Sequence, residues 1–195
     1  FSTDGMAYKL KTWRLPLGAR TAKGKAIVNI LPIQAGISIA AVMPVDAPEE
    51  EWEKLQIIFS TSSGDVRRNA LSDFTNVRSN GKIAMDLPED ITLVNARIAN
   101  EDDDVMLVTD SGRAIRFSTT AVRVFKGRKS TGVRGIKLLG DDKVVSMSII
   151  RHFEASPDER SAYLKMRRAV AGMSDDAVGS LEEEDEEINA NATIT

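Results

Sequence analysis

The chain has 195 residues, long enough for one domain with a sizeable core, and carries 26 Lys and Arg against 29 Asp and Glu. Taken whole, the formal net charge of −3 argues against an obvious nucleic-acid binder. A hydrophobic content of 42% excludes a disordered tail, and no apolar run approaches the ~20 residues that span a bilayer. Cysteine is absent and His152 is the single histidine, which excludes disulfides, thiolate metal sites and multi-histidine centres. The composition therefore predicts a soluble, cytoplasmic protein.

Three segments of the chain share one pattern. Each has an apolar run, a small polar turn that ends in glycine, a basic strand, a second glycine and another apolar strand. Successive turn glycines are 59 and 48 residues apart, and a period near 50 with several short strands is typical of propeller-type arrays. The turn glycine and the second glycine of each repeat are, in order, Gly5 and Gly24, Gly64 and Gly81, and Gly112 and Gly132.

The local sequence favours β-strands over residues 1–150. Small polar turns between Val-, Ile- and Phe-rich runs predict tight hairpins, in which glycine supplies a positive φ. The runs IIFST (57–61), VMLVT (105–109) and VVSMSII (144–150) predict strands buried on both faces. We therefore expect an all-β array of antiparallel, propeller-like blades, with repeats at about 1–50, 51–100 and 101–150.

The C-terminal part has a different character. Residues 1–150 carry a net charge of +3, whereas residues 151–195 carry −6. Ser156, Pro157 and Glu159 are typical of a helix start with a capping box, which predicts a short amphipathic helix over 151–172. The acidic run that follows predicts a largely disordered segment over 173–195.

Basic residues recur at corresponding positions of the repeats. The fourth residue after each turn glycine is basic, and further cations flank both glycines, while acidic residues collect between units at 46–53 and 101–104. Such spacing predicts a curved basic track that suits the phosphates of a bent duplex, although strand-edge cations also serve solubility alone. The candidate DNA-binding residues are Lys9, Lys11, Lys23, Lys25, Arg67, Arg68, Lys82, Arg113, Arg116, Lys129 and Arg134.

The sequence indicates no active site. It contains neither a phosphate-binding loop nor a dinucleotide fingerprint, and Tyr8 has no base near it in the sequence. We predict that Trp13 and Trp52 are packing residues and that His152 is structural or solvent-exposed. The acidic run 101–104 lacks the ligand spacing of a calcium loop and predicts a solvated turn.

Four ordered strings add a family resemblance to this interpretation. MAYKLKTWRLP (6–16), KGKAIVNILP (23–32), NGKIAM (80–85) and STGVRGIKL (130–138) resemble the C-terminal domain of bacterial DNA gyrase A. The resemblance covers essentially all of 1–150, and residues 151–195 resemble an acidic insertion of some gyrase A chains. It implies a β-pinwheel, a six-bladed propeller-like domain whose basic rim wraps DNA, of which about three repeats form an incomplete ring. The wrapping contacts that it implies fall on the candidate cations named above.

The resemblance also implies partners and a role. The chain would be a non-catalytic DNA-wrapping segment of an ATP-dependent type II topoisomerase that introduces negative supercoils. Two motifs of this family, the catalytic arginine–tyrosine motif and the glutamine–arginine–glycine wrapping box, are missing from this sequence. The implied partners are duplex DNA, the rest of gyrase A and gyrase B in an A2B2 heterotetramer. ATP and Mg²⁺ would bind other domains or gyrase B, and no cofactor is expected on this chain.

Two alternatives remain open on the sequence. One is the equivalent domain of topoisomerase IV, whose parent enzyme decatenates DNA instead of supercoiling it. The other is a protein-binding propeller scaffold whose surface charges only keep it soluble. The acidic end either competes with DNA for the basic track or acts as a solvated spacer.

Overall fold

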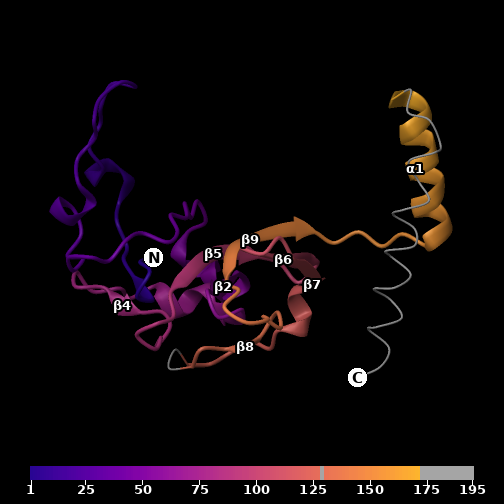
Figure 1. Ribbon diagram of the computed structural model, residues 1–195. Coiled ribbons are helices and arrows are strands. Elements are labelled where there is room, and N and C mark those ends of the chain that lie inside the picture. Colours follow the sequence, from indigo (N-terminus) through magenta and orange to yellow (C-terminus); the bar gives the residue numbers. More distant parts are fainter. Residues whose placement is uncertain (128–129, 172–195) are drawn as a thin grey trace. The chain divides into compact units, whose positions relative to one another are not determined.

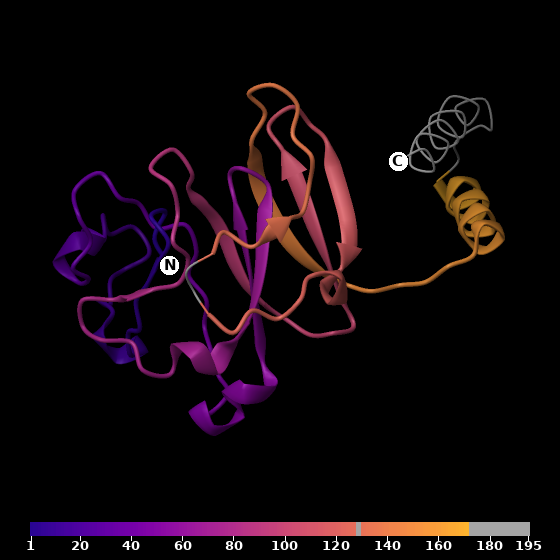
Figure 2. The same ribbon diagram turned by 90° about the horizontal axis from the view of Figure 1, so that it is seen from below.

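The computed structural model describes residues 1–127 and 130–171 and divides into two units, Phe1–His152 and a second that begins at Phe153 (Figures 1 and 2). The strands are β1 (Met6–Ala7), β2 (Gln56–Thr61), β3 (Asp65–Ala70), β4 (Lys82–Ile83), β5 (Leu93–Ala99), β6 (Asp103–Thr109), β7 (Ala114–Ser118), β8 (Val133–Arg134) and β9 (Val144–Arg151). The helices are the 3₁₀ turns η1 (Thr12–Arg14), η2 (Ile27–Asn29), η3 (Glu49–Lys54), η4 (Leu71–Phe74) and η5 (Thr119–Ala121), and the α-helix α1 (Pro157–Ala171). Within the described ranges, no helix is long and apolar enough to cross a membrane.

The first unit is built of antiparallel sheets, which confirms the expected fold class. Across the described residues the strand orders are β1-β4, β5-β2-β3-β8 and β7-β6-β9, and none of these sheets closes on itself. Each long hairpin turns at a small polar loop that ends in glycine, as predicted. The turn glycines have φ values of +82° to +83°, a backbone conformation that residues with a Cβ rarely adopt. A hydroxyl three residues before the glycine supports two of these loops: Thr61 Oγ1 accepts from the amide of Asp65, and Thr109 Oγ1 from that of Arg113.

Successive repeats exchange a short strand. β4, which follows the second glycine of the second repeat, pairs with β1 of the first repeat, and β8 pairs in the same way with β3. The register is the same in both pairs. The residue directly after a turn glycine, Met6 or Asp65, faces the residue two positions after the second glycine of the next repeat, Ile83 or Arg134. A sheet therefore draws its strands from two consecutive repeats.

The exchange forces a close backbone approach at Gly132. A Cβ at this position would lie 2.1 Å from the carbonyl oxygen of Val66, and φ is +103°. Gly132 is therefore required both for its backbone conformation and for its lack of a side chain.

The core lies on both faces of β2. Ile57 and Phe59 pack into one apolar cluster, with Leu71, Phe74 and Met85, and Ile58 packs into a second cluster on the other face. This confirms the prediction for the run 57–61. The prediction is wrong for β9, because Val145, Ser146 and Ser148 are exposed while Val144 and Met147 are buried. Only one face of β9 meets the second cluster, and a register shift opposite Val108 and Thr109 brings Val144 to the same cluster as Met147.

The first repeat differs from the others in one long segment. Residues 11–26 are exposed throughout, and the chain before β2, drawn in indigo to violet in Figure 1, makes an excursion away from the sheets. Leu15 and Val28 are exposed here. Their counterparts in the second repeat, Phe74 and Met85, are buried in the core.

The second unit contains α1, which begins at Pro157. The prediction of a helix from residue 151 is wrong at its start, because β9 continues to Arg151. The capping box is confirmed: Glu159 Oε2 accepts from the amide and hydroxyl of Ser156, and Ser156 Oγ accepts from the amide of Glu159. These bonds lower the pKa of Glu159. The predicted helix end at Gly172 and the acidic segment 173–195 lie outside the described residues.

A carboxylate joins the tip of the β6–β7 hairpin to the turn before β9. Asp142 accepts from the Ser111 hydroxyl at 2.6 Å, from the Ser111 amide at 3.0 Å and from the Lys143 amide at 2.9 Å. The bond from the Ser111 hydroxyl is the main reason why the pKa of Asp142 falls from 3.8 to about 2. Since the folded-state pKa is the lower one, the carboxylate stabilises the fold fully above about pH 4 and loses this effect towards about pH 2.

We expect Asp142→Asn to lower the urea midpoint of unfolding at pH 7 and to converge with the parent chain near pH 2. Asp141→Asn, at the exposed neighbouring carboxylate, is the control and should leave the midpoint almost unchanged at both pH values. A difference between Asp142→Asn and the parent that does not vary with pH would contradict this role.

Candidate nucleic-acid interface

The recurrent cation four residues after each turn glycine is held by a carboxylate. Lys9 is hydrogen-bonded to Glu49, and its ammonium also donates to the Thr75 carbonyl at 3.2 Å. Arg68 is paired with Glu101 at 2.8 Å. In both cases the acid lies between two repeats, and the cation reaches a segment of the next repeat. In the first two repeats the recurrent cation therefore makes a contact between repeats.

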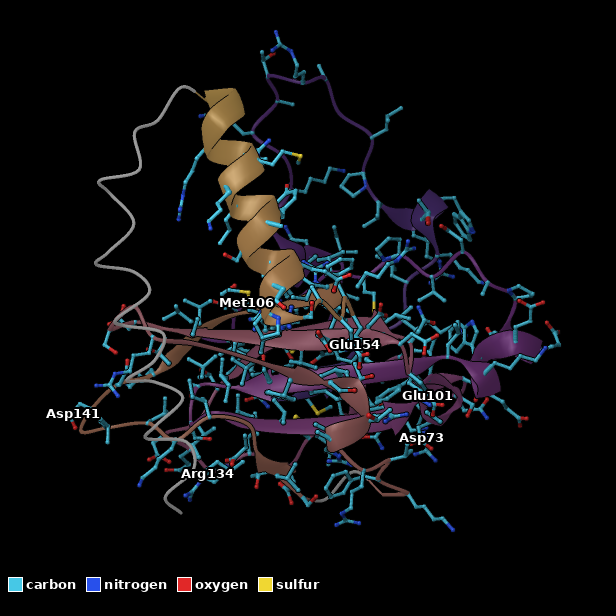
Figure 3. All side chains as sticks on the ribbon, turned by 90° about the vertical axis from the view of Figure 1, so that its right-hand side faces the viewer. Asp73, Glu101, Met106, Arg134, Asp141 and Glu154 are labelled. Carbon is cyan, nitrogen blue, oxygen red and sulfur yellow. The ribbon has the colours of Figure 1, made fainter. Side chains whose placement is uncertain are left out.

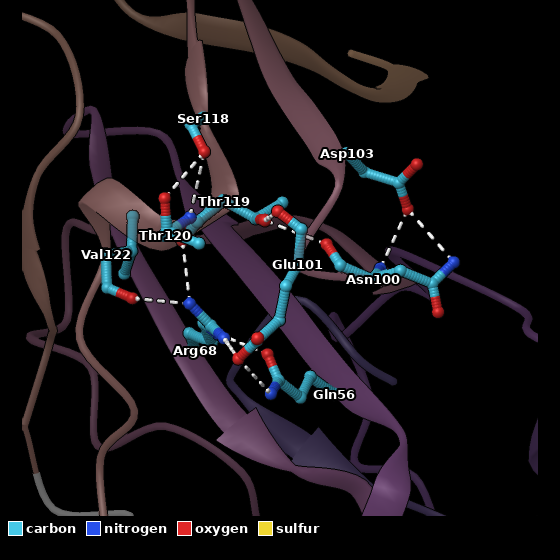
Figure 4. A network of polar contacts seen from close by, with 9 residues as sticks. All are labelled: Gln56, Arg68, Asn100, Glu101, Asp103, Ser118, Thr119, Thr120 and Val122. Atoms are coloured by element: carbon cyan, nitrogen blue, oxygen red, sulfur yellow. Dashed lines mark hydrogen bonds and ion pairs between the residues drawn. The ribbon is translucent and has the colours of Figure 1, made fainter.

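Arg68 has the most developed of these contacts (Figure 4). Its Nη1 donates to the carbonyls of Thr119 at 3.1 Å and Val122 at 3.3 Å, its Nη2 to Glu101, and its Nε to Gln56. The side chain is only 4% exposed. Five donors in a fixed planar arrangement suit arginine to such a site, where lysine has only a point charge.

Arg67 also lies inside the fold. The residue is 0% exposed, its Nη1 donates to the Ser130 carbonyl at 2.7 Å, and its guanidinium lies over the ring of Phe125. The placement of Arg67 and Arg68 on an exposed basic track is therefore wrong. Both belong to β3, and their guanidinium groups bind backbone carbonyls of η5 and of the segment that follows it. Their charges are therefore used for packing within the fold.

Arg116 shares a buried carboxylate with the histidine. The Asp104 carboxylate lies 2.8 Å from His152 Nδ1 through Oδ1 and 3.5 Å from Arg116 Nε through Oδ2. The Asp104 side chain is 2% exposed. The prediction of a solvated turn at 101–104 is thus wrong for Asp104, which belongs to β6. Arg116 itself remains half exposed, so its charge is partly neutralised but reachable from solvent.

Lys82 and Lys129 are the candidates near the second glycines of the second and third repeats. Lys82 is half-buried, and its ammonium donates to the Asp73 carbonyl at 2.6 Å, so this cation is engaged within the fold. Lys129 lies outside the described residues.

The remaining five candidates are exposed, namely Lys11, Lys23, Lys25, Arg113 and Arg134. Among the described residues, none of them lies within 4.0 Å of a carboxylate oxygen. Arg113 and Arg134 lie toward the hairpin-tip end of the strands, which also carries Asp141; Figure 3 shows Arg134 and Asp141 at the opposite end from Glu101 and Asp73. This end therefore has mixed charge.

Two stretches of the sequence are basic and contain no acidic residue. Between Asp110 and Asp141 the chain contains eight cations, and between Asp4 and Asp46, in the first repeat, it contains six. Two of the six, Arg14 and Arg20, are exposed, but neither lies beside a repeat glycine, so the glycine pattern does not predict them. The absence of acids over this length was the signal that could have found them.

The surroundings of Tyr8 and the possible metal ligands were the remaining candidates for a reactive site. Burial raises the pKa of Tyr8, and the charge of Asp4 acts in the same direction, so the phenol is held protonated. No group of three His, Asp or Glu side chains in the described part could hold a metal ion. Trp52 packs in the core and donates to the Ala47 carbonyl at 3.0 Å, which confirms its prediction. Trp13 is 77% exposed, so the prediction of a packing role is wrong for it.

Tandem antiparallel sheets that exchange a short strand across each repeat boundary define a propeller-type repeat domain with a basic first repeat. The chain belongs to the family described as DNA gyrase C-terminal domain, beta-propeller, which it matches over residues 1–32, 56–100 and 103–151. The three matched segments correspond to the three repeats.

The chain is similar to the DNA gyrase A proteins of several bacteria. It is 46% identical to that of Granulibacter bethesdensis over 99% of this chain, and 43% identical to that of Salmonella typhimurium over 77%. It spans only about a fifth of these relatives, 21% and 17% of their lengths.

Solved structures with the same architecture include two relevant domains. The C-terminal domain of DNA topoisomerase IV matches with a TM-score of 0.67 and 25% identity, covering 78% of this chain and 46% of that one. The C-terminal domain of DNA gyrase A matches with a TM-score of 0.60 and 22% identity, covering 75% and 45%. The second likeness bears on the fold alone.

Proposed function

We propose that the chain binds duplex DNA through its phosphate backbone and is a non-catalytic DNA-wrapping segment of gyrase A. In that role it assists ATP-dependent negative supercoiling, together with the rest of gyrase A and with gyrase B in an A2B2 complex. The observation that carries the proposal is the exposed, acid-free segment of the first repeat, in a chain that belongs to the gyrase C-terminal domain family. Repeated cations on a curved array suit regularly spaced phosphates.

The set of proposed DNA contacts differs from the set that the sequence alone indicates. Arg67 and Arg68 are excluded by burial, and Lys9 and Lys82 are engaged within the fold. The proposed DNA contacts are Lys11, Lys23, Lys25, Arg113 and Arg134, with Arg14 and Arg20 added and Arg116 contributing in part.

Binding of this kind should depend on salt and ignore base sequence. We expect the log of the association constant to fall linearly with log salt concentration, by about 0.9 for each phosphate neutralised, and to be alike for two duplexes of unrelated sequence and similar flexibility. Fluorescence anisotropy of labelled duplexes measures both quantities. Absence of binding, or affinity that does not vary with salt, would refute the proposal and favour a protein-binding scaffold.

Topoisomerase IV is the second candidate, and its higher TM-score is the observation in its favour. The higher sequence identity to gyrase A proteins favours gyrase. The complete parent enzyme, assayed on relaxed and on catenated plasmids, separates the two: we expect negative supercoiling with ATP, whereas decatenation without supercoiling would favour topoisomerase IV.

A further inference from the structure

The indole of Trp13 stands at the tip of a fixed turn. η1 is closed by two hydrogen bonds, from the Arg14 amide to the Lys11 carbonyl at 2.9 Å and from the Leu15 amide to the Thr12 carbonyl at 3.0 Å. The residue is 77% exposed, although its apolar surface is the largest of any side chain type. A hydrogen-bonded turn thus presents a large aromatic ring to solvent.

Comparison of the repeats shows that packing between repeats does not account for this exposure. The 3₁₀ turns η1, η4 and η5 all begin seven residues after a turn glycine, so Trp13 corresponds to Ser72 and Thr120. Ser72 is half-buried and Thr120 is exposed. By contrast, the position of Leu15 corresponds to Phe74 and Val122, which are both buried. Leu15 is therefore at a position that packs against a neighbouring repeat, whereas Trp13 is at a surface position.

The surroundings of Trp13 are cationic, and they too are peculiar to this repeat. Lys11 and Arg14 flank it, and the Arg14 guanidinium lies 5.1 Å from the centre of the ring. Their counterparts in the other two repeats are Ala70 and Asp73, and Ser118 and Ala121. The binding partner of such a turn must therefore combine negative charge with a flat apolar surface.

Duplex DNA has both properties, and this inference rests on the proposed function. Proteins that bend DNA often insert an apolar side chain at a base step, where it partly unstacks the bases and kinks the duplex. We infer that Trp13 is a DNA-contacting side chain that inserts at a base step from the minor groove, while Lys11 and Arg14 bind the adjacent phosphates. The contact fixes a bend in the duplex at the first repeat and favours flexible pyrimidine–purine steps.

The test is a fluorescence titration of the full chain with a duplex rich in TA steps and with a stiff A-tract duplex. We expect DNA to quench Trp13 emission, because the indole stacks on bases, while buried Trp52 does not respond. Trp13→Ala should lose the quenching and weaken affinity for the TA-rich duplex about tenfold, with the salt slope unchanged because no charge is lost. Trp13→Phe should retain part of the affinity. The matched control is Val42→Ala, which truncates a side chain that is 78% exposed, and it should leave affinity unchanged.

The outcomes separate this inference from the proposed function. Salt-dependent binding without quenching, and with equal affinity of Trp13→Ala and the parent chain, would overturn the role of Trp13 and leave DNA binding intact. Quenching by vesicles that contain anionic phosphatidylserine but not by DNA would also overturn it. Failure of the parent chain to bind either duplex at low salt would instead refute the proposed function.

Discussion

Gly132→Ala is expected to destabilise the chain by about 3 kcal/mol or more. The added Cβ would lie 2.1 Å from the Val66 carbonyl oxygen, and a positive φ of 103° strains any residue with a side chain. Relief requires β8 to move away from β3, which breaks the exchanged strand pair. Urea unfolding followed by circular dichroism measures the loss.

Gly112→Ala is the matched control, since its φ of +83° gives a similar backbone strain but a Cβ there meets nothing within 4 Å. We expect this variant to lose only about 1–2 kcal/mol. Equal losses for the two variants would show that the close approach of β8 to β3 adds no steric cost at Gly132.

Arg68→Met is expected to cost about 3 kcal/mol and to leave the DNA affinity of the folded chain unchanged. The substitution keeps a similar apolar length but leaves the carbonyls of Thr119 and Val122 without their donor. Arg113→Met should behave in the opposite way, with stability within about 0.5 kcal/mol of the parent and weaker DNA binding. Thermal unfolding and anisotropy on the same two proteins measure both effects.

The opposite result for Arg68→Met would contradict the structural role of Arg68. If Arg68→Met remained as stable as the parent and lost DNA affinity, the arginine would be a DNA contact after all. Its burial between two repeats would then have no energetic role.

The repeat pattern and the hairpins could be predicted from the sequence because glycine has a local reason to be there. All six repeat glycines have positive φ, which few other residues adopt. The exchanged strands could not be predicted, because β4 and β8 have only two residues each and carry no periodic signal. Their pairing depends on carbonyl positions in another repeat, which no local pattern encodes.

The site was harder to predict because one sequence signal has two physical explanations. A cation at a fixed position in every repeat can face phosphates, or it can hold the next repeat in place. The acids between repeats are the missing information, because their position in the sequence does not reveal that Glu49 pairs with Lys9 and Glu101 with Arg68. Exposure of Trp13 was likewise beyond the sequence, since an aromatic residue in a strand-rich repeat is usually buried.

The net charge of the chain is a poor guide to its surface charge, because some charged side chains pair with each other inside the fold. Part of the basic charge of the repeats is used for contacts between repeats, and so is part of the acidic charge. In the first repeat Lys11, Lys23 and Lys25 remain exposed with no acid near them in sequence, so this repeat contributes three cations to the proposed interface.

The most direct test is the salt dependence of duplex binding by the chain that carries Lys11→Gln, Lys23→Gln and Lys25→Gln together. All three side chains are exposed, so the fold should be unaffected. We predict weaker binding and a slope of log affinity against log salt that is shallower by about 2–3, whereas Lys54→Gln, at an exposed lysine beside acidic residues, leaves the slope unchanged. An unchanged slope in the triple variant would contradict phosphate binding by the first repeat.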